Sequence, residues 1–110
     1  MIRIKIYQTK KKEILGFETL GHAESTDEGY DLVCSAASIL VLNTVNSIEK
    51  LTDSKVSEKT NAKDGRISFK LKTSPSKETQ LLFRSMVIGL ESMVDDDYYS
   101  KYIELKFEEV

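Results

Sequence analysis

Apolar residues recur at every second position in several segments of this chain, and this short period constrains its fold more than any other feature. Residues 2–7 alternate in this way and place Ile2, Ile4 and Ile6 on one face. Similar patterns predict strands at 14–20, near 56, at 66–72 and at 103–107. A strand with one apolar face needs another layer to cover that face, so the sequence predicts a sheet packed against other elements.

Two longer segments lie between these strands, and their apolar residues have the spacing of helices. The first follows the small residues 35–38 and carries apolar residues three and four positions apart as far as Leu51. The second begins at Ser74-Pro75, a pair suited to the first turn of a helix, and ends at the aspartates 95–97. Its apolar residues cover more than one stripe, so we expect this helix to be buried on two sides.

Small residues on the second helix, Ser85, Gly89 and Ser92, would let another helix come close. That neighbour is either the first helix or the same helix of a second copy of the chain. In both cases the predicted order of elements is β-β-α-β-β-α-β. The expected fold is of the α/β class, α+β type: one mixed β-sheet with two helices packed on one face.

The composition limits the classes of function. The chain has 110 residues, 40% of them apolar, which is enough for one core, so we expect residues 1–110 to form a single domain. The formal net charge is −2, whereas proteins that bind nucleic acid are usually strongly basic. Because Met1 leads directly into the first strand pattern, we expect neither a signal peptide nor a membrane segment, and a cytoplasmic protein.

The chain contains one cysteine and one histidine, at the two ends of an irregular segment. His22 follows the second predicted strand, and Cys34 stands where residues 21–33, predicted to be a loop, give way to a helix. A thiolate at a helix N-terminus is stabilised by unpaired N–H groups, which also suit a negatively charged carbonyl oxygen. With an imidazole to take and return the proton, the pair would form the dyad of a cysteine nucleophile.

Other interpretations of these residues stay open at this point. A single cysteine in a helix is commonly a small buried hydrophobic residue. One thiol and one imidazole do not make a structural zinc site, so no metal or cofactor is expected. The segment between them holds Glu24, Asp27, Glu28 and Asp31, which either form a solvated loop or attract a basic substrate. Asp31 could instead orient His22.

Two short motifs in this region resemble one known family. The chain carries Gly21-His22-Ala23 and, after a variable loop, Gly29-Tyr30-Asp31-Leu32-Val33-Cys34-Ser35-Ala36-Ala37-Ser38. Together they resemble the signature of the ribosomal-processing cysteine protease family, called Prp, which is G-H-A, a loop, and G-x-D-[IV]-V-C-[AS]-x-x-S. Leu32 stands where the family has Ile or Val, a conservative difference. The similarity in length and element order spans essentially the whole chain.

The resemblance implies a cytoplasmic bacterial endopeptidase that is active as a homodimer. It would remove a short N-terminal extension from a ribosomal large-subunit protein, protein twenty-seven, on the carboxyl side of an aromatic residue, as a step needed for ribosome assembly. By the same resemblance Cys34 is the nucleophile and His22 is the general base. Gly21 would let the loop move, and Asp31 and Ser38 would support the site.

Two other functions compete with the protease. A non-catalytic binding module or chaperone would hold the same basic ribosomal protein without cutting it, and it would still bind after Cys34→Ala. Thiol redox or acyl-transfer chemistry is disfavoured because the chain has no second cysteine to resolve an oxidised thiol. The sequence therefore predicts a hydrolase with a protein substrate, and no direct binding of nucleic acid or membrane.

Overall fold

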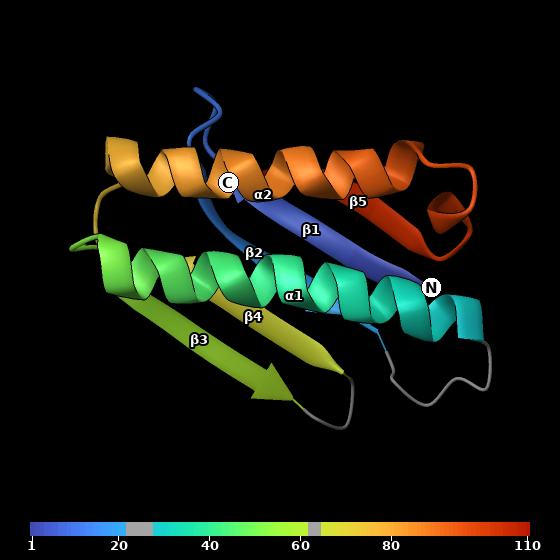
Figure 1. The fold of residues 1–110 in the computed structure, drawn as a ribbon. Coiled ribbons are helices and arrows are strands. Elements are labelled where there is room, and N and C mark those ends of the chain that lie inside the picture. The colour runs from blue at the N-terminus through green and yellow to red at the C-terminus, as the bar shows by residue number, and fades with distance from the viewer. Residues whose placement is uncertain (22–27, 62–64) are drawn as a thin grey trace.

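The computed structural model describes residues 1–21, 28–61 and 65–110, and it has two layers: a five-stranded sheet and two helices on one of its faces (Figure 1). Along the chain the elements are β1 (Ile2–Gln8), β2 (Ile14–Leu20), α1 (Glu28–Leu51), β3 (Val56–Asn61), β4 (Arg66–Leu71), α2 (Lys77–Asp95), a short 3-10 helix η1 (Tyr99–Lys101) and β5 (Ile103–Glu109). This order and the single mixed sheet confirm the predicted fold class.

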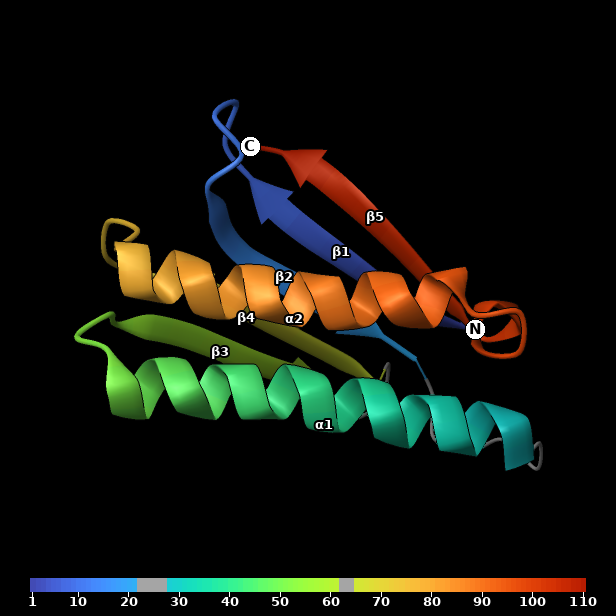
Figure 2. The ribbon, with the colours of Figure 1, turned by 45° about the horizontal axis from the view of Figure 1, so that its top comes forward.

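The strands lie across the sheet in the order β3-β4-β2-β1-β5. β1 and β2 form an antiparallel hairpin whose turn places Lys12 at a φ of 66°. β3 and β4 also pair antiparallel, and β4 joins this pair to β2. β5 returns after α2 and pairs parallel with β1, so both arrows point the same way in Figure 2. Among the described strands, β3 and β5 therefore form the two edges of the sheet.

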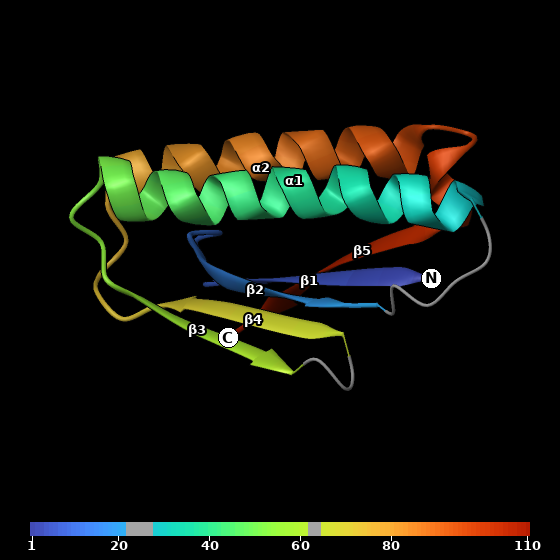
Figure 3. The same cartoon turned by 60° about the horizontal axis from the view of Figure 1, so that its bottom comes forward.

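The core lies between the sheet and the layer of helices, which Figure 3 shows from the side. The three isoleucines of β1 are buried there, as their alternation predicted. Phe17 of β2 stacks on Phe69 of β4, with ring centroids 5.4 Å apart, and Phe83 of α2 meets Phe69 edge-on at 6.2 Å. These rings join both hairpins to α2 and fix the helix above the middle of the sheet.

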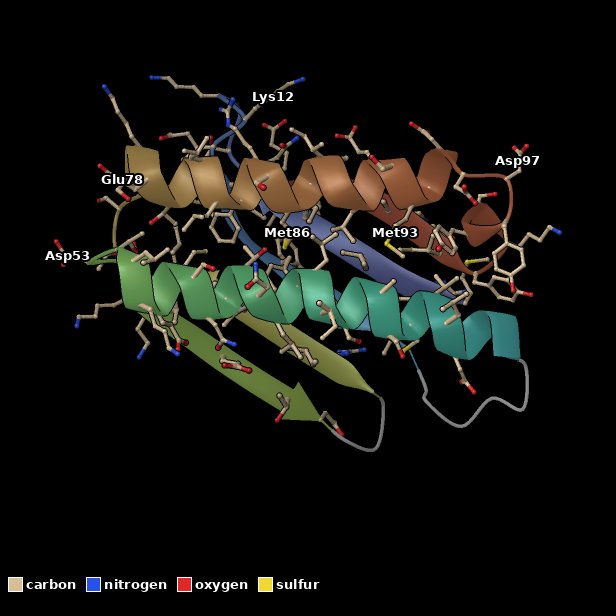
Figure 4. All side chains as sticks on the ribbon, viewed as in Figure 1. Lys12, Asp53, Glu78, Met86, Met93 and Asp97 are labelled. Atoms are coloured by element: carbon tan, nitrogen blue, oxygen red, sulfur yellow. The ribbon has the colours of Figure 1, made fainter. Side chains whose placement is uncertain are left out.

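The two helices run side by side in opposite directions (Figure 1). Met86 and Met93 project from α2 toward the core, as the side chains in Figure 4 show. A Cβ built at Gly89 would lie 2.7 Å from a side-chain carbon of Leu40 on α1. The first helix is therefore the neighbour that approaches this small residue of α2.

α2 is covered on two sides, by the sheet and by α1, as predicted, but some of its apolar residues lie on neither side. Leu81 and Ile88 are 69% and 65% exposed, so part of the apolar surface of this helix faces solvent. The sheet covers one face of α2 and α1 lies beside it, which leaves the outer face open in the single chain.

The predicted loop at 21–33 is wrong over residues 28–33, because α1 begins at Glu28, and residues 22–27 of it lie outside the described residues. The reason is tertiary packing rather than local preference. Val33 is fully buried in the core, and Gly29 lies against the side chains of Tyr98 and Tyr102 from the end of the chain. These contacts favour a helix in a segment without a clear apolar period.

One described helix, α1 over Asp31–Leu51, is long and apolar enough to cross a membrane by length and composition, with a mean hydropathy of 1.4. The core helix of a soluble protein passes the same test. Here Val33, Ala37 and Val41 of α1 are buried in the core beside the sheet. The helix is therefore weak evidence for a membrane span.

Candidate active site

Cys34 lines a groove of about 410 Å³ between α1 and the sheet. It is the seventh residue of α1 and is half-buried. Ser38 follows four positions later, so its side chain lies on the same face of the helix, and it lines the same groove. Leu42, one further turn along α1, extends this wall of the groove. The thiol therefore stands in a concave surface that a peptide can enter.

The floor of the groove contains a row of residues from four adjacent strands. Ile4 of β1 pairs with Thr19 of β2, Thr19 pairs with Ile67 of β4, and Ile67 pairs with Thr60 of β3. All four residues line the groove. Sequence reasoning missed this row, because the strand order and register that align it have no signal within any single strand.

The described lining of the groove is mainly apolar. Arg66 is the one charged residue within it, and its Nε lies 3.8 Å from a carboxylate oxygen of Glu18. At the same end of the sheet the N–H of Gly21 donates to the carbonyl of Gly65 over 3.2 Å, and both glycines line the groove. A groove of this chemistry suits the apolar side chains of an extended peptide.

The structure brings three of the five predicted site residues to one place. Gly21, Cys34 and Ser38 all line the groove. Asp31 is exposed on α1, one turn before Cys34, and is not among the described residues that line the groove. His22 lies outside the described residues, so its contacts with Cys34 and Asp31 stay predictions.

The position of Cys34 within α1 corrects one part of the chemical argument. Because α1 begins at Glu28, Cys34 lies in its second turn, where backbone N–H groups bond to carbonyls four residues earlier. The prediction that free N–H groups of a helix N-terminus surround Cys34 and hold an oxyanion is wrong. Any donor to a carbonyl oxygen attacked by this thiol has to come from another part of the site.

The sequence predicted no metal site, and it left open whether the acidic residues between His22 and Cys34 attract a basic substrate. Among residues 1–21, 28–61 and 65–110, no group of three or more His, Cys, Asp or Glu side chains is arranged to hold a metal ion. Glu24 and Asp27 lie outside these ranges. Attraction of a basic substrate by the acidic segment therefore stays a prediction.

Comparison with known proteins identifies the family of this chain. A family model described as Cysteine protease Prp matches residues 1–104. The chain belongs to the cysteine protease Prp family. It is therefore a thiol protease, a hydrolase of peptide bonds, as its two motifs predicted.

Curated relatives agree with this membership of the Prp family. The Ribosomal processing cysteine protease Prp of Bacillus subtilis (strain 168) is 31% identical over 102 residues, which cover 89% of this chain and 90% of the relative. The protein of the same name from Staphylococcus aureus (strain Mu50) is 24% identical over 107 residues, which cover 97% of this chain and 99% of the relative. The similarity is thus to whole proteins.

Solved structures share the fold of this Prp-family chain. The S. aureus protease Prp in complex with a substrate peptide matches 98% of this chain and 100% of its own, with a TM-score of 0.89 at 23% identity. The same protease with a covalently linked product peptide matches with a TM-score of 0.84 at 24% identity. A Streptococcus mutans protein matches 100% of this chain and 99% of its own, with a TM-score of 0.88 at 27% identity.

Proposed function

We propose that Cys34 is the catalytic nucleophile of this Prp-family protease and that His22 is its general base. The imidazole takes the thiol proton, and the thiolate attacks the carbonyl carbon of the peptide bond. The C–N bond breaks as the imidazolium gives its proton to the departing amine, which leaves a thioester on Cys34. Water, deprotonated by His22, then hydrolyses the thioester and restores the thiol. The observation that carries this proposal is the half-buried position of Cys34 in the wall of a mainly apolar groove.

The substrate is the precursor of ribosomal large-subunit protein twenty-seven, from which the enzyme removes an N-terminal extension in the cytoplasm as a step in ribosome assembly. The names of the relatives from B. subtilis and S. aureus, both ribosomal processing proteases, support this assignment. The mainly apolar lining of the groove beside Cys34 supports a cut after an aromatic residue, since it can cover a large apolar side chain.

Residues 1–110 act as one protease domain. Within it, three further residues support the dyad of Cys34 and His22. Ser38 lies one turn from Cys34 in the same groove, within reach of a bound peptide. Gly21 directly precedes His22 in the chain and gives the backbone freedom there. Asp31 is exposed, which leaves its carboxylate accessible to orient His22.

The active form is a homodimer that needs no metal, cofactor, membrane or nucleic acid. Apolar side chains on exposed parts of both helices support self-association: Ile39, Leu81 and Ile88 are each at least 65% exposed. Exposed apolar surface of this kind is suited to a protein interface. Light scattering of the purified chain, beside an Ile88→Lys variant, measures the dimer directly; a wild-type monomer would exclude it.

Intact mass spectrometry of the extended ribosomal protein, after incubation with this chain, tests the function. The wild-type chain should remove the extension, whereas Cys34→Ala and His22→Ala should not, with melting curves to control for the fold. Ser35→Ala is the matched control, since Ser35 is exposed beside Cys34 but is not among the residues that line the groove. Binding without any product in the wild type would favour the non-catalytic module instead.

A further inference from the structure

Gly29 lies in the first turn of α1 against two tyrosine hydroxyl groups. A Cβ built at Gly29 would lie 2.5 Å from Oη of Tyr102, 2.7 Å from Cζ of the same ring and 2.7 Å from Oη of Tyr98. Real Cβ atoms essentially never approach other atoms so closely, so any side chain at this position would force the helix or the tyrosines to move. Glycine is also a poor helix former, and this packing explains why it stands inside a helix.

The two tyrosines belong to a small aromatic group around η1, which we call the tyrosine cluster: Tyr98, Tyr99 and Tyr102. The ring centroids of Tyr98 and Tyr99 are 5.8 Å apart, as are those of Tyr98 and Tyr102. The N–H groups of Tyr98 and Tyr99 both donate to Oδ1 of Asp96, at 2.8 and 2.9 Å. Because Asp96 caps the end of α2, the cluster is held to that helix.

Tyr102 contacts both the strand and the helix that border the active-site groove. Its carbonyl accepts a hydrogen bond of 2.8 Å from the N–H of Ile2, the first residue of β1 and part of the lining of the groove. Its ring packs on Gly29, five residues before Cys34 on the same helix. One residue therefore joins the strand at the floor of the groove to the helix that carries the thiol.

We propose that Tyr98 and Tyr102 are positioning residues for catalysis. By packing on Gly29 they set where α1 begins relative to β1, and a helix transmits that position over less than two turns to Cys34. The inference rests on the proposed role of Cys34 as the nucleophile. Its experimental signature is a change in the reactivity of Cys34 and in kcat that the loss of thermal stability does not explain.

Gly29→Ala tests the proposal, with Gly89→Ala as its matched control. A Cβ at Gly89 would lie 2.7 Å from the Leu40 side chain, so both variants press on α1, but neither Gly89 nor Leu40 lines the groove. Well below both melting temperatures, Gly29→Ala should lower kcat for a peptide spanning the cut site at least about tenfold, and Gly89→Ala should lower it less than about twofold. The pH profile of Cys34 alkylation by iodoacetamide should shift only in Gly29→Ala.

A variant with both tyrosines changed separates an effect of the tyrosine contact from a general effect of alanine in the helix. Tyr98→Phe together with Tyr102→Ala removes the three atoms that the new methyl group would meet, so adding Gly29→Ala to this pair should cause no further loss. The positioning role would be overturned if Gly29→Ala and Gly89→Ala lowered kcat equally. It would also be overturned if Gly29→Ala lowered kcat as much in the double tyrosine variant as in the wild type. Failure of the wild-type chain to cleave would instead refute the proposed function, and the alkylation profiles would still test the tyrosine contact.

Discussion

Replacing Leu42 by alanine removes an apolar side chain from the wall of the groove that contains Cys34. Leu42 is 41% exposed, so a bound peptide can cover at most that fraction of it. Full burial of a leucine side chain is worth about 1.5–3 kcal/mol, and 41% of that range is about 0.6–1.2 kcal/mol. At 25 °C such a loss should raise the dissociation constant of the substrate by about three- to eightfold.

Fluorescence anisotropy of a labelled peptide that spans the cut site measures this constant, in a Cys34→Ala background so that no cleavage occurs. Leu51→Ala is the matched control, because Leu51 lies on the same helix, is 73% exposed and is not part of the lining of the groove. It should leave the dissociation constant unchanged. An unchanged constant in Leu42→Ala, or an equal rise in both variants, would refute binding of the substrate in this groove.

The remaining predictions concern residues of the fold that do not line the groove. Gln80→Ala should lower the free energy of unfolding in urea by about 1–3 kcal/mol, because the amide of Gln80 bonds both the N–H and the carbonyl of Ile14, at 2.7 Å each. Gln80→Glu should be less destabilising, relative to wild type, in acid than at neutral pH, since only a protonated carboxyl can donate to the Ile14 carbonyl; equal losses at both pH values would contradict this. Thr79→Val should cost about 1–3 kcal/mol, because the fully buried hydroxyl of Thr79 bonds that of Ser54 at 2.6 Å; an unchanged urea midpoint would exclude this role. Burial, and then nearby carboxylates, raise the pKa of Tyr7 above 10.0, so the stability linked to its neutral phenol is present below that pH and is lost as the pH rises through the folded-state pKa. Ultraviolet titration beside Tyr7→Phe measures this ionisation, and a midpoint at or below 10.0 would contradict it.

The elements of this fold were predictable because each apolar period is local. The alternation in β1 identified the residues that face the core, and the helical spacing identified both helices. The pairing of β1 with β5 joins residues near opposite ends of the chain and has no local signal. The row from Ile4 to Thr60 depends on such register, so the floor of the groove could not be predicted from the sequence.

The site was predictable in part for the same reason. Cys34 and Ser38 are four residues apart, which places them on one face of any helix that contains both. The start of that helix was not predictable, because Gly29 disfavours a helix locally and its contacts with Tyr98 and Tyr102 come from residues far along the chain. Because this long-range packing extends α1 back to Glu28, Cys34 lies in the second turn and not at the expected helix N-terminus.

The nucleophilic role proposed for Cys34 requires a thioester between Cys34 and the N-terminal part of the substrate. Acid quenching of a single-turnover reaction, followed by intact mass and peptide mapping, detects this thioester. The wild-type chain should gain the mass of the removed extension less one water, on the fragment that contains Cys34, and should lose this mass as the reaction completes. Cleavage by Cys34→Ala, or an adduct on any other residue, would contradict a nucleophilic role for Cys34.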